Sequence, residues 1–401
     1  MHIVLFAPIP YDSLHQRPQK LADCFTARGH RVLYVEPSSW KDFFSGRTKG
    51  FIWAIVRAVW YHLVLAWLPY RVRQRGARAG PPLLRLKIPL GIPINRTSSS
   101  AVNVLTQRVY QAFLKREIVS AVPTADSVAL VEQPYWGNVI GPADFSRIYY
   151  DCIDDFSVFV GRNSFERYAA AERRLLKQSA AAFVTARELE RRLLSQSPEM
   201  RIVRVPNAAD AEWFAVQAQD KAADAELTGI SSPRAGYVGY LGPWLDYRLL
   251  ATAMVAAPDV QFVFIGPVND KAGFDLLRRQ QNFHWLGVKP YNDVPAFVNA
   301  LDCCLIPFRP GNIARTTNPV KIFEYFSLGK PVVTTPVLEL EQYRDRQLVF
   351  WAADPDSFVR GIRSALREQG NALAEERKAV ARENTWSARA DLMLAIMIEQ
   401  S

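Results

Sequence analysis

The chain has 401 residues, of which 49% are hydrophobic and 22% are charged. This length suggests two domains of ordinary size, and this composition excludes a disordered chain. The formal net charge is +10, but it is concentrated in residues 41–116, which hold fourteen Lys and Arg and a single acid, Asp42. One basic segment on an otherwise near-neutral chain argues against a protein that coats nucleic acid, so no nucleic-acid partner is expected.

The four cysteines have no C-x-x-C spacing. They predict reduced thiols rather than a disulfide framework or a zinc site, and no metal is expected. The first residues, MHIVLFAPIP, have neither a basic leading region nor a small-residue cleavage site. They indicate a first strand rather than a signal peptide, and a cytoplasmic location is expected.

Short apolar strands alternate with helical segments, which is typical of an α/β chain with parallel sheets. In the first half, the apolar runs predict strands at 2–8, 31–36, 128–132, 147–152, 181–185 and 202–206. The segments between them predict helices at 17–29, 102–119, 165–179 and 186–196.

A polar passage rich in Ala and Asp at 217–233 resembles a linker, and the alternation starts again after it. The second half predicts strands at 235–240, 261–265, 283–286, 303–307 and 331–335, and helices at 247–256, 273–280, 294–300 and 319–327. We therefore expect two doubly wound domains, 1–216 and 233–384. Such sheets bind ligands at the carboxyl ends of their strands.

The helix predicted at 319–327 carries two charged side chains one turn apart. Pro319 fits the first turn of a helix, Lys321 lies in that turn, and Glu324 follows one turn later. A lysine beside the N–H groups of a helix start makes an anion pocket for phosphates, and a carboxylate can accept two hydrogen bonds from a diol such as ribose. A solvated Lys–Glu pair on an amphipathic helix is the alternative.

The turn between the first strand and the first helix carries His15, Gln16 and Arg17. An arginine at a helix start is unfavourable next to the helix dipole, which points to an anionic or sugar partner. A basic surface turn is the alternative.

Acidic residues follow two later strands of the first half: Glu132 follows one, and Asp151, Asp154 and Asp155 follow the next. Carboxylates at strand ends are well placed for acid–base catalysis or for contacts with substrate hydroxyls. Helix caps or a solvated turn are the alternatives.

The segment 51–70, FIWAIVRAVWYHLVLAWLPY, is long enough to cross a bilayer, but a crossing here would split the first domain across the membrane. A helix lying in the membrane interface fits better, and the arginines that follow it would attract anionic lipids. A buried helix pair with a solvated basic loop is the alternative. The residues expected to contact the membrane are Trp53, Trp60, Trp67, Arg71, Arg73, Arg75 and Arg78.

The segment NPVKIFEYFSLGKP at 318–331 resembles the donor-binding helix of GT-B glycosyltransferases, in particular glycosyltransferase family 4. Within that family, the likeness is to bacterial enzymes of teichuronic acid and exopolysaccharide synthesis. Further matching segments occur in the same order, at 15–22 (HQRPQKLA), 150–155 (YDCIDD), 205–210 (VPNAAD), 236–242 (GYVGYLG), 264–267 (FIGP) and 306–308 (IPF).

The resemblance implies a GT-B fold of two Rossmann-like domains that face a central cleft, with the final helix, 385–401, crossing back onto the first domain. The second domain would bind a nucleotide-sugar donor, with Lys321 on the pyrophosphate and Glu324 on the ribose. The first domain would bind the acceptor through Gln16, Arg17 and Tyr135. The resemblance also implies transfer with retention, without a metal and without an assigned nucleophile. The candidate catalytic residues are His15, Glu132, Asp154 and Asp155.

The sequence departs from the family pattern at two places. The first glutamate of the E-x7-E motif is replaced by Thr316, and the turn at 239–246 has neither of the cations that often follow it. A leaving diphosphate must still have its charge neutralised, so other cations are expected near it. The remaining candidate donor contacts are Gly239, Gly242, Arg309, Arg315, Thr316, Thr317 and Asn318.

The resemblance implies a glycosyltransferase of cell-envelope or exopolysaccharide synthesis. The basic and apolar segment 41–116 suggests that it acts at the inner leaflet of the plasma membrane, on a lipid-linked or other glycan acceptor. Two alternatives stay open. One is a nucleotide-sugar epimerase with GT-B architecture, and the other is a non-catalytic partner of an assembly complex.

Overall fold

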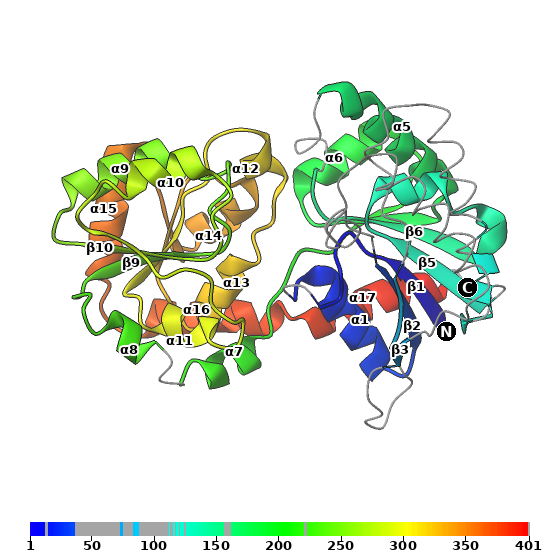
Figure 1. Cartoon of the computed structure of the whole chain (residues 1–401), viewed down its shortest axis with the longest axis horizontal. Coiled ribbons are helices and arrows are strands. Elements are labelled where there is room, and N and C mark those ends of the chain that lie inside the picture. The colour runs from blue at the N-terminus through cyan, green and yellow to red at the C-terminus, as the bar shows by residue number, and fades with distance from the viewer. Residues whose placement is uncertain are drawn as a thin grey trace, which may run out of the picture. The chain divides into compact units, whose positions relative to one another are not determined.

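The protein was analysed as a computed structural model, which describes residues 1–12, 15–36, 73–74, 83–87, 112, 115–116, 118–119, 121–123, 126–155, 162–219 and 223–399. The chain forms two compact units. The first comprises Met1–Val184, Leu189–Arg204 and Ala390–Ser401, and the second comprises Thr185–Glu188 and Val205–Arg389. Each unit contains a largely parallel sheet with helices packed against it (Figure 1). The expected interfacial helix at 51–70 and most of the helix at 102–119 lie outside the described residues.

Among the described residues, the sheet of the first unit has eight strands in the order β3-β4-β2-β1-β5-β6-β7-β8. Neighbouring strands are parallel except for β3 and β4. The central strands are almost entirely apolar and buried, as a parallel sheet covered on both faces requires. The strands are β1 (His2–Phe6), β2 (Arg31–Glu36), β3 (Arg73–Gln74), β4 (Leu84–Lys87), β5 (Ser127–Val131), β6 (Arg147–Cys152), β7 (Ala181–Val184) and β8 (Ile202–Arg204).

The described helices of the first unit include the C-terminal end of the chain. Tyr149 donates its hydroxyl to the carbonyl of Met397 at 3.4 Å, and Arg28 forms an ion pair with Asp391, so the end of α17 packs onto this unit. The helices are α1 (Arg17–Ala27), α5 (Arg162–Gln178), α6 (Arg187–Gln196) and α17 (Trp386–Glu399), with the 3-10 turns η2 (Pro134–Asn138) and η3 (Pro142–Asp144).

The sheet of the second unit has six strands among the described residues, all parallel, in the order β11-β10-β9-β12-β13-β14. Its first strand, β9, starts a second round of strand–helix alternation, as the sequence predicted. The strands are β9 (Arg234–Val238), β10 (Gln261–Ile265), β11 (Phe283–Trp285), β12 (Cys303–Ile306), β13 (Val332–Thr334) and β14 (Val349–Trp351).

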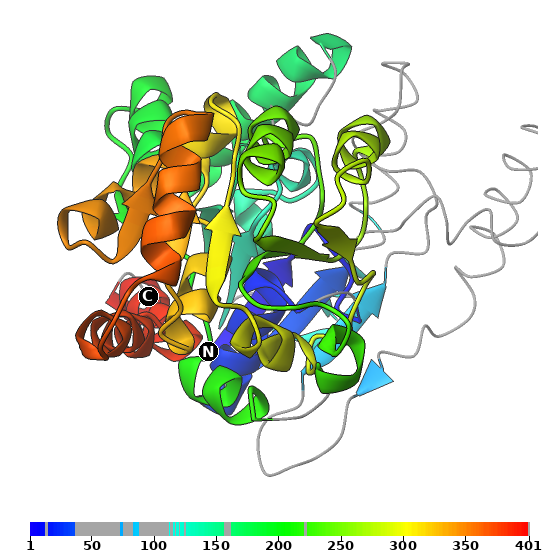
Figure 2. The same ribbon diagram turned by 90° about the vertical axis from the view of Figure 1, so that its left-hand side faces the viewer.

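Helices cover both faces of this second sheet (Figures 1 and 2). Helix α9 packs with α10 and α15 on one face, and α13 packs with α7 and α16 on the other. The helices are α7 (Ala211–Gln217), α8 (Asp224–Leu227), α9 (Tyr247–Ala256), α10 (Lys271–Leu277), α11 (Val294–Asn299), α12 (Asn312–Thr316), α13 (Lys321–Ser327), α14 (Glu341–Asp345), α15 (Pro355–Leu366) and α16 (Ala372–Glu383), with the 3-10 turn η5 (Leu338–Leu340).

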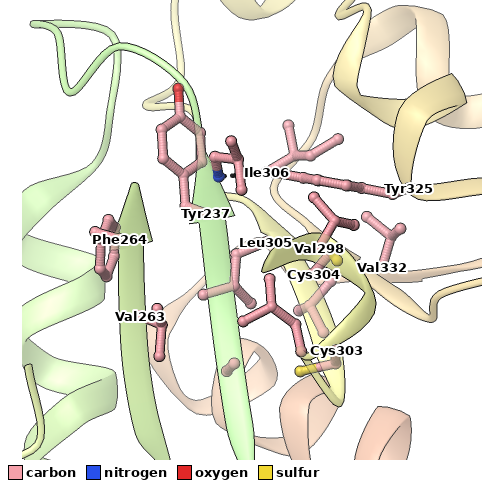
Figure 3. Packing of buried hydrophobic residues seen from close by; sticks show 14 of the residues in the cluster. Tyr237, Val263, Phe264, Val298, Cys303, Cys304, Leu305, Ile306, Tyr325 and Val332 are labelled. Carbon is pink, nitrogen blue, oxygen red and sulfur yellow. Dashed lines mark hydrogen bonds between the residues drawn. The ribbon is translucent and has the colours of Figure 1, made fainter. Parts of the chain in front are cut away.

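The core of the second unit fixes α13 against the end of β9 (Figure 3). Tyr325 of α13 is fully buried, and its hydroxyl oxygen accepts a hydrogen bond from the backbone N–H of Val238 at 3.0 Å. This bond satisfies two buried polar groups at once, which would otherwise be costly. The charged residues of α13 are therefore held at the carboxyl end of β9.

Several boundaries differ from those predicted. Strand β9 ends at Val238 because Gly239 turns the chain with a φ of +140°. Helix α13 begins at Lys321, two residues later than the spacing indicated. Helix α7 falls in the second unit, where Phe214 is buried in the core, whereas the sequence analysis assigned it to the first domain.

Candidate functional site

Two glycine loops meet at the carboxyl edge of the second sheet. Gly239 donates its N–H to the carbonyl of Ile265 at 2.8 Å. A Cβ atom on Gly266 would lie 2.1 Å from the carbonyl oxygen of Gly239, and Gly266 itself has a φ of +133°. Only glycine allows this conformation and this approach, so the loops after β9 and β10 are held together by their lack of side chains.

Gly242, the other glycine predicted for the donor turn, is packed against its own loop. A Cβ atom on Gly242 would lie 2.5 Å from the ring of Trp244. The loop continues through a bridge between Leu245 and Phe308, and the N–H of Arg309 donates to the carbonyl of Trp244 at 2.8 Å. This places the loop after β9 beside the loop after β12.

Lys321, the first residue of α13, lies at the Gly239 loop. Its Nζ is 5.1 Å from the ring centroid of Tyr237 and 5.4 Å from that of Phe308. A Cβ atom on Gly239 would lie 3.4 Å from the same Nζ. The ammonium group therefore rests on two aromatic faces, which orient it beside a backbone turn.

Glu324 lies one turn further along α13 and is bonded to a neighbouring tyrosine. The hydroxyl of Tyr291 donates to Oε1 of Glu324 at 3.1 Å, and the Tyr291 ring stacks on Trp213 at 5.2 Å. Burial, with the charge of Glu324, raises the pKa of Tyr291, so this hydroxyl keeps its proton. The carboxylate is thus fixed in place by a donor from a different loop.

The other residues predicted for the donor site are engaged within the second unit. Thr316 is buried and donates its hydroxyl to the carbonyl of Asn312 at 2.9 Å. This uncharged side chain therefore does not supply the negative charge of the glutamate that the E-x7-E motif has at this position. Asn318 is also buried, and its side-chain oxygen accepts the N–H of Asn207 at 3.0 Å. Thr317 between them is half-buried.

The two arginines predicted for the diphosphate differ in their surroundings. Arg315 is 59% exposed and forms an ion pair with Glu188 at 2.9 Å. Arg309 is exposed and directly follows Phe308, whose ring lies under the ammonium group of Lys321. Arg309 is therefore near the Gly239 loop, whereas the charge of Arg315 is partly used by its partner.

The first unit pairs Arg17 with an acid of the protein itself. Its Nε and Nη2 each donate at 2.8 Å to one oxygen of Asp151, and both side chains are almost completely buried. The sequence analysis expected an anionic or sugar partner for Arg17, and the structure gives Asp151 instead. The reason is that β6, which carries Asp151, lies two strands from β1 at the same edge of the sheet.

His15 and Gln16 precede this helix and are more accessible. His15 Nδ1 lies 4.0 Å from Asp23, and the Gln16 side chain is exposed at the N-cap of α1. The backbone N–H of Gln16 donates to the side chain of Gln19 at 3.1 Å.

The acids of the first unit lie at the same edge. Glu132 is completely buried, and neither of its carboxyl oxygens has a hydrogen-bond partner in the described part of the chain. Burial, with the charge of Asp151, raises the pKa of Glu132 well above its usual range. Burial, with the charge of Asp155, raises the pKa of Asp154 to about 7.

Tyr135, the predicted acceptor contact, is buried in the first unit. Its ring meets that of Tyr168 edge-on at 5.8 Å, and its hydroxyl has no hydrogen-bond partner among the described residues. A buried hydroxyl without a partner can bind a ligand only after local movement.

The candidate membrane residues Trp53, Trp60, Trp67, Arg71, Arg75 and Arg78 lie outside the described residues, and only the backbone of Arg73 is described, in β3. Among the helices that the structure describes, none combines the length and apolar character needed to span a membrane. A search of the same residues finds no cluster of His, Cys, Asp or Glu able to hold a metal ion.

The comparisons with known proteins agree with this arrangement. Residues 232–368 match the family model of glycosyl transferases group 1. Over 261 residues the chain is 24% identical to the Bacillus subtilis protein named as teichuronic acid biosynthesis glycosyltransferase TuaH. That match covers 61% of this chain and 64% of the relative, which is slightly less than two thirds of the relative's length.

Solved structures match nearly the whole chain. Sucrose-phosphate synthase from Thermosynechococcus elongatus has a TM-score of 0.69 at 14% identity, covering 100% of this chain and 98% of the other. Anabaena HepE, solved in complex with UDP and glucose, has a TM-score of 0.63 at 12% identity, covering 99% of both chains.

The chain therefore has the GT-B fold, and residues 232–368 of its second unit match the model of glycosyl transferases group 1. Both findings confirm what the motif at 318–331 implied. The similarity to the Bacillus teichuronic acid protein extends over more residues than that match.

Proposed function

We propose that the protein is a glycosyltransferase that moves a sugar from a nucleoside diphosphate sugar to a glycan acceptor. The observation that carries this proposal is the position of Lys321 at the Gly239 loop with Glu324 one turn away, within the group 1 domain. The lysine is suited to the negative charge of a leaving diphosphate, and the carboxylate to the ribose hydroxyls.

Uridine is the proposed base, supported by the UDP found in the HepE structure of the same fold. In the reaction, the bond between the anomeric carbon and the phosphate oxygen breaks and a bond to the acceptor oxygen forms. The proton of the acceptor hydroxyl leaves with the diphosphate. Retention at the anomeric carbon and independence from metal are part of the proposal, and no nucleophile is assigned.

Nucleotide binding tests the donor site. Lys321→Met keeps the apolar contacts with Tyr237 and Phe308 but removes the charge, and Glu324→Gln removes the carboxylate. Calorimetry should show UDP binding weakened about tenfold or more in each variant, which corresponds to about 1.4 kcal/mol. Lys378→Met, which removes a solvated lysine paired with Glu375, is the matched control and should bind like the parent. Equal binding by all four proteins would disprove the donor-site assignment.

The acceptor is proposed to bind the first unit, with His15, Gln16, Glu132, Asp154 and Asp155 as the candidate contacts. A role in cell-envelope polysaccharide synthesis is supported by the teichuronic acid relative. A lipid-linked acceptor is part of the proposal, because the basic, aromatic segment 41–116 supports attachment to the inner leaflet.

Membrane attachment is tested separately by flotation with liposomes. The protein should float with vesicles that contain anionic lipids and should float less after Arg71, Arg73, Arg75 and Arg78 are all replaced by Ala. Absence of flotation, or flotation unchanged by the four substitutions, would refute attachment through this segment while leaving the donor site unaffected.

A further inference from the structure

The sheet of the first unit has a switch point between β1 and β5. Strands β2 and β4 lie on one side of β1, and β5, β6 and β7 lie on the other. In open α/β sheets, ligands bind at the carboxyl edge beside such a point. The described parts of the segments that leave β1, β5 and β6 there are 7–12, 15–17, 132–138 and 153–155.

These described segments contain more acidic than basic side chains. Arg17 is their single Lys or Arg, and their acids are Asp12, Glu132, Asp154 and Asp155. An anionic ligand at this edge would need a cation to offset the repulsion from those of these acids that are ionised. The state of the nearby arginines therefore decides which ligands this edge accepts.

Two arginines that the structure describes at this edge already bind carboxylates. Arg17 makes two hydrogen bonds of 2.8 Å to Asp151 and is 3% exposed. Arg85 of β4 makes two of 2.8 Å to Asp12 and one of 2.5 Å to Glu36. A bidentate pair leaves a guanidinium little capacity for a phosphate, which would have to displace a carboxylate.

Glu132 adds a second carboxyl group beside the Arg17–Asp151 pair. Val131 of β5 pairs with Tyr150 of β6, so the next residues of the two strands, Glu132 and Asp151, are neighbours on one face of the sheet. One guanidinium cannot neutralise two carboxylates, and neither oxygen of Glu132 has a partner in the described chain.

The charge state of Glu132 depends on the charged and titratable groups around it. Asp151, Arg17 and Tyr34 are the charged or titratable groups that interact with it among the described residues. Burial, with the charge of Asp151, raises the pKa of Glu132, which favours the protonated, neutral form of this carboxyl group. A neutral carboxyl group both donates and accepts hydrogen bonds, as a sugar hydroxyl does.

We propose that this switch point binds an uncharged, hydroxyl-rich sugar as the acceptor and rejects sugar phosphates and sugar acids. Accessible polar groups in these described segments include His15, Gln16, Gln133 and Asp154, each at least partly exposed. Imidazole, amide and carboxylate groups can form hydrogen bonds with sugar hydroxyls. A phosphate or carboxylate on the ligand would instead lie beside acidic side chains, and these described segments offer it no guanidinium that is not already paired with a carboxylate. The inference rests on the proposed transfer reaction and specifies its acceptor.

The test compares matched acceptors on the full chain with UDP bound. Methyl glycosides of glucose, galactose and mannose are titrated by calorimetry beside the 6-phosphate and the uronic acid of the same ring. The preferred neutral sugar should bind at least tenfold more tightly than either of its anionic counterparts. Tighter binding of an anionic sugar, or no binding of any neutral one, would overturn the proposal. UDP affinity in the same samples reports on the donor site independently.

A charge variant separates recognition from structure. Asp154→Lys should shift the ratio of anionic to neutral affinity at least tenfold toward the anionic sugars, because it places a cation at the edge. Asp126→Lys makes the same change at an exposed residue at the amino end of β5 and should leave the ratio unchanged. An equal shift in both variants, or in neither, would contradict the proposed site.

Discussion

Glu132 is a carboxyl group that the fold shields both from water and from the hydrogen-bond donors of the described chain. Its ionised form would place a second negative charge beside Asp151, in a position where only Arg17 offsets it. An acid of this kind stays protonated in the folded protein and ionises when the chain unfolds. The folded state therefore loses stability as pH rises above the ordinary value of 4.5, up to the raised pKa.

Glu132→Gln should remove this pH dependence, because an amide has the shape of the neutral acid and does not ionise. As pH rises above 5 toward the raised pKa of Glu132, the variant should become progressively more stable than the parent, by up to about 1.4 kcal/mol per pH unit. Thermal unfolding at several pH values measures the difference, which should be small at pH 5.

Glu172 offers the matched control, since it is also a buried acid of the first unit. Its oxygens accept hydrogen bonds from Tyr150, Arg192 and Gln196. Glu172→Gln should lower stability at neutral pH, because it leaves a guanidinium without its anion. A Glu132→Gln variant that behaves in the same way would show that Glu132 is ionised in the folded protein.

At the residue scale, spacing along one helix was predictable and contacts between distant segments were not. The positions of Lys321 and Glu324 one turn apart follow from helix geometry. The aromatic faces under Lys321, from Tyr237 and Phe308, come from two other loops, and no local pattern signals them. Asp151 as the partner of Arg17 was missed for the same reason, since the two residues are 134 positions apart.

The glycine loops show how one element positions another. Gly266 lets the loop after β10 approach the Gly239 carbonyl, and the Gly239 loop in turn lies against Lys321. The positions of most strands along the chain were predictable from the sequence, because buried parallel strands appear in it as continuous apolar runs. The close approach of the two loops was not predictable, because a glycine in the sequence does not show which distant segment will pack against it.

Gly266→Ala should therefore destabilise the second unit. The new methyl group would overlap the Gly239 carbonyl, and alanine is strained at a φ of +133°, so we expect a loss of about 2 kcal/mol or more. Thermal unfolding measures the loss. Gly229→Ala is the control, because a Cβ atom there has no neighbour within 4 Å, and it should change stability by less than about 0.5 kcal/mol. Equal effects of the two substitutions would contradict the packing described for the glycine loops.

At the scale of the whole molecule, the repeated strand–helix alternation predicted two doubly wound sheets, and the structure confirms them. The exact division was harder to predict. Helix α7 packs on α13 and α11 of the second unit although it precedes the polar passage that resembled a linker. The polarity of residues 217–233 suggested a linker there, whereas the boundary between the two units depends on where the apolar face of α7 is buried.

The net charge of +10 is also best interpreted at the scale of the whole chain. The candidate donor residues Arg309, Arg315 and Lys321 lie in the second unit, far along the chain from the basic segment 41–116. The excess charge therefore belongs to a different part of the sequence from the candidate nucleotide site, which is consistent with the proposed role at an anionic membrane surface.

The central claim is tested most directly by sugar transfer itself. A panel of labelled nucleoside diphosphate sugars is incubated with the full chain, neutral sugar acceptors and a lipid-linked glycan fraction, with and without EDTA. We predict that one donor passes its label to an acceptor with equal release of nucleoside diphosphate, that EDTA has no effect, and that Lys321→Met lowers kcat/KM about 100-fold. Nucleotide binding without transfer from any donor, or conversion of the donor to its epimer, would contradict the account.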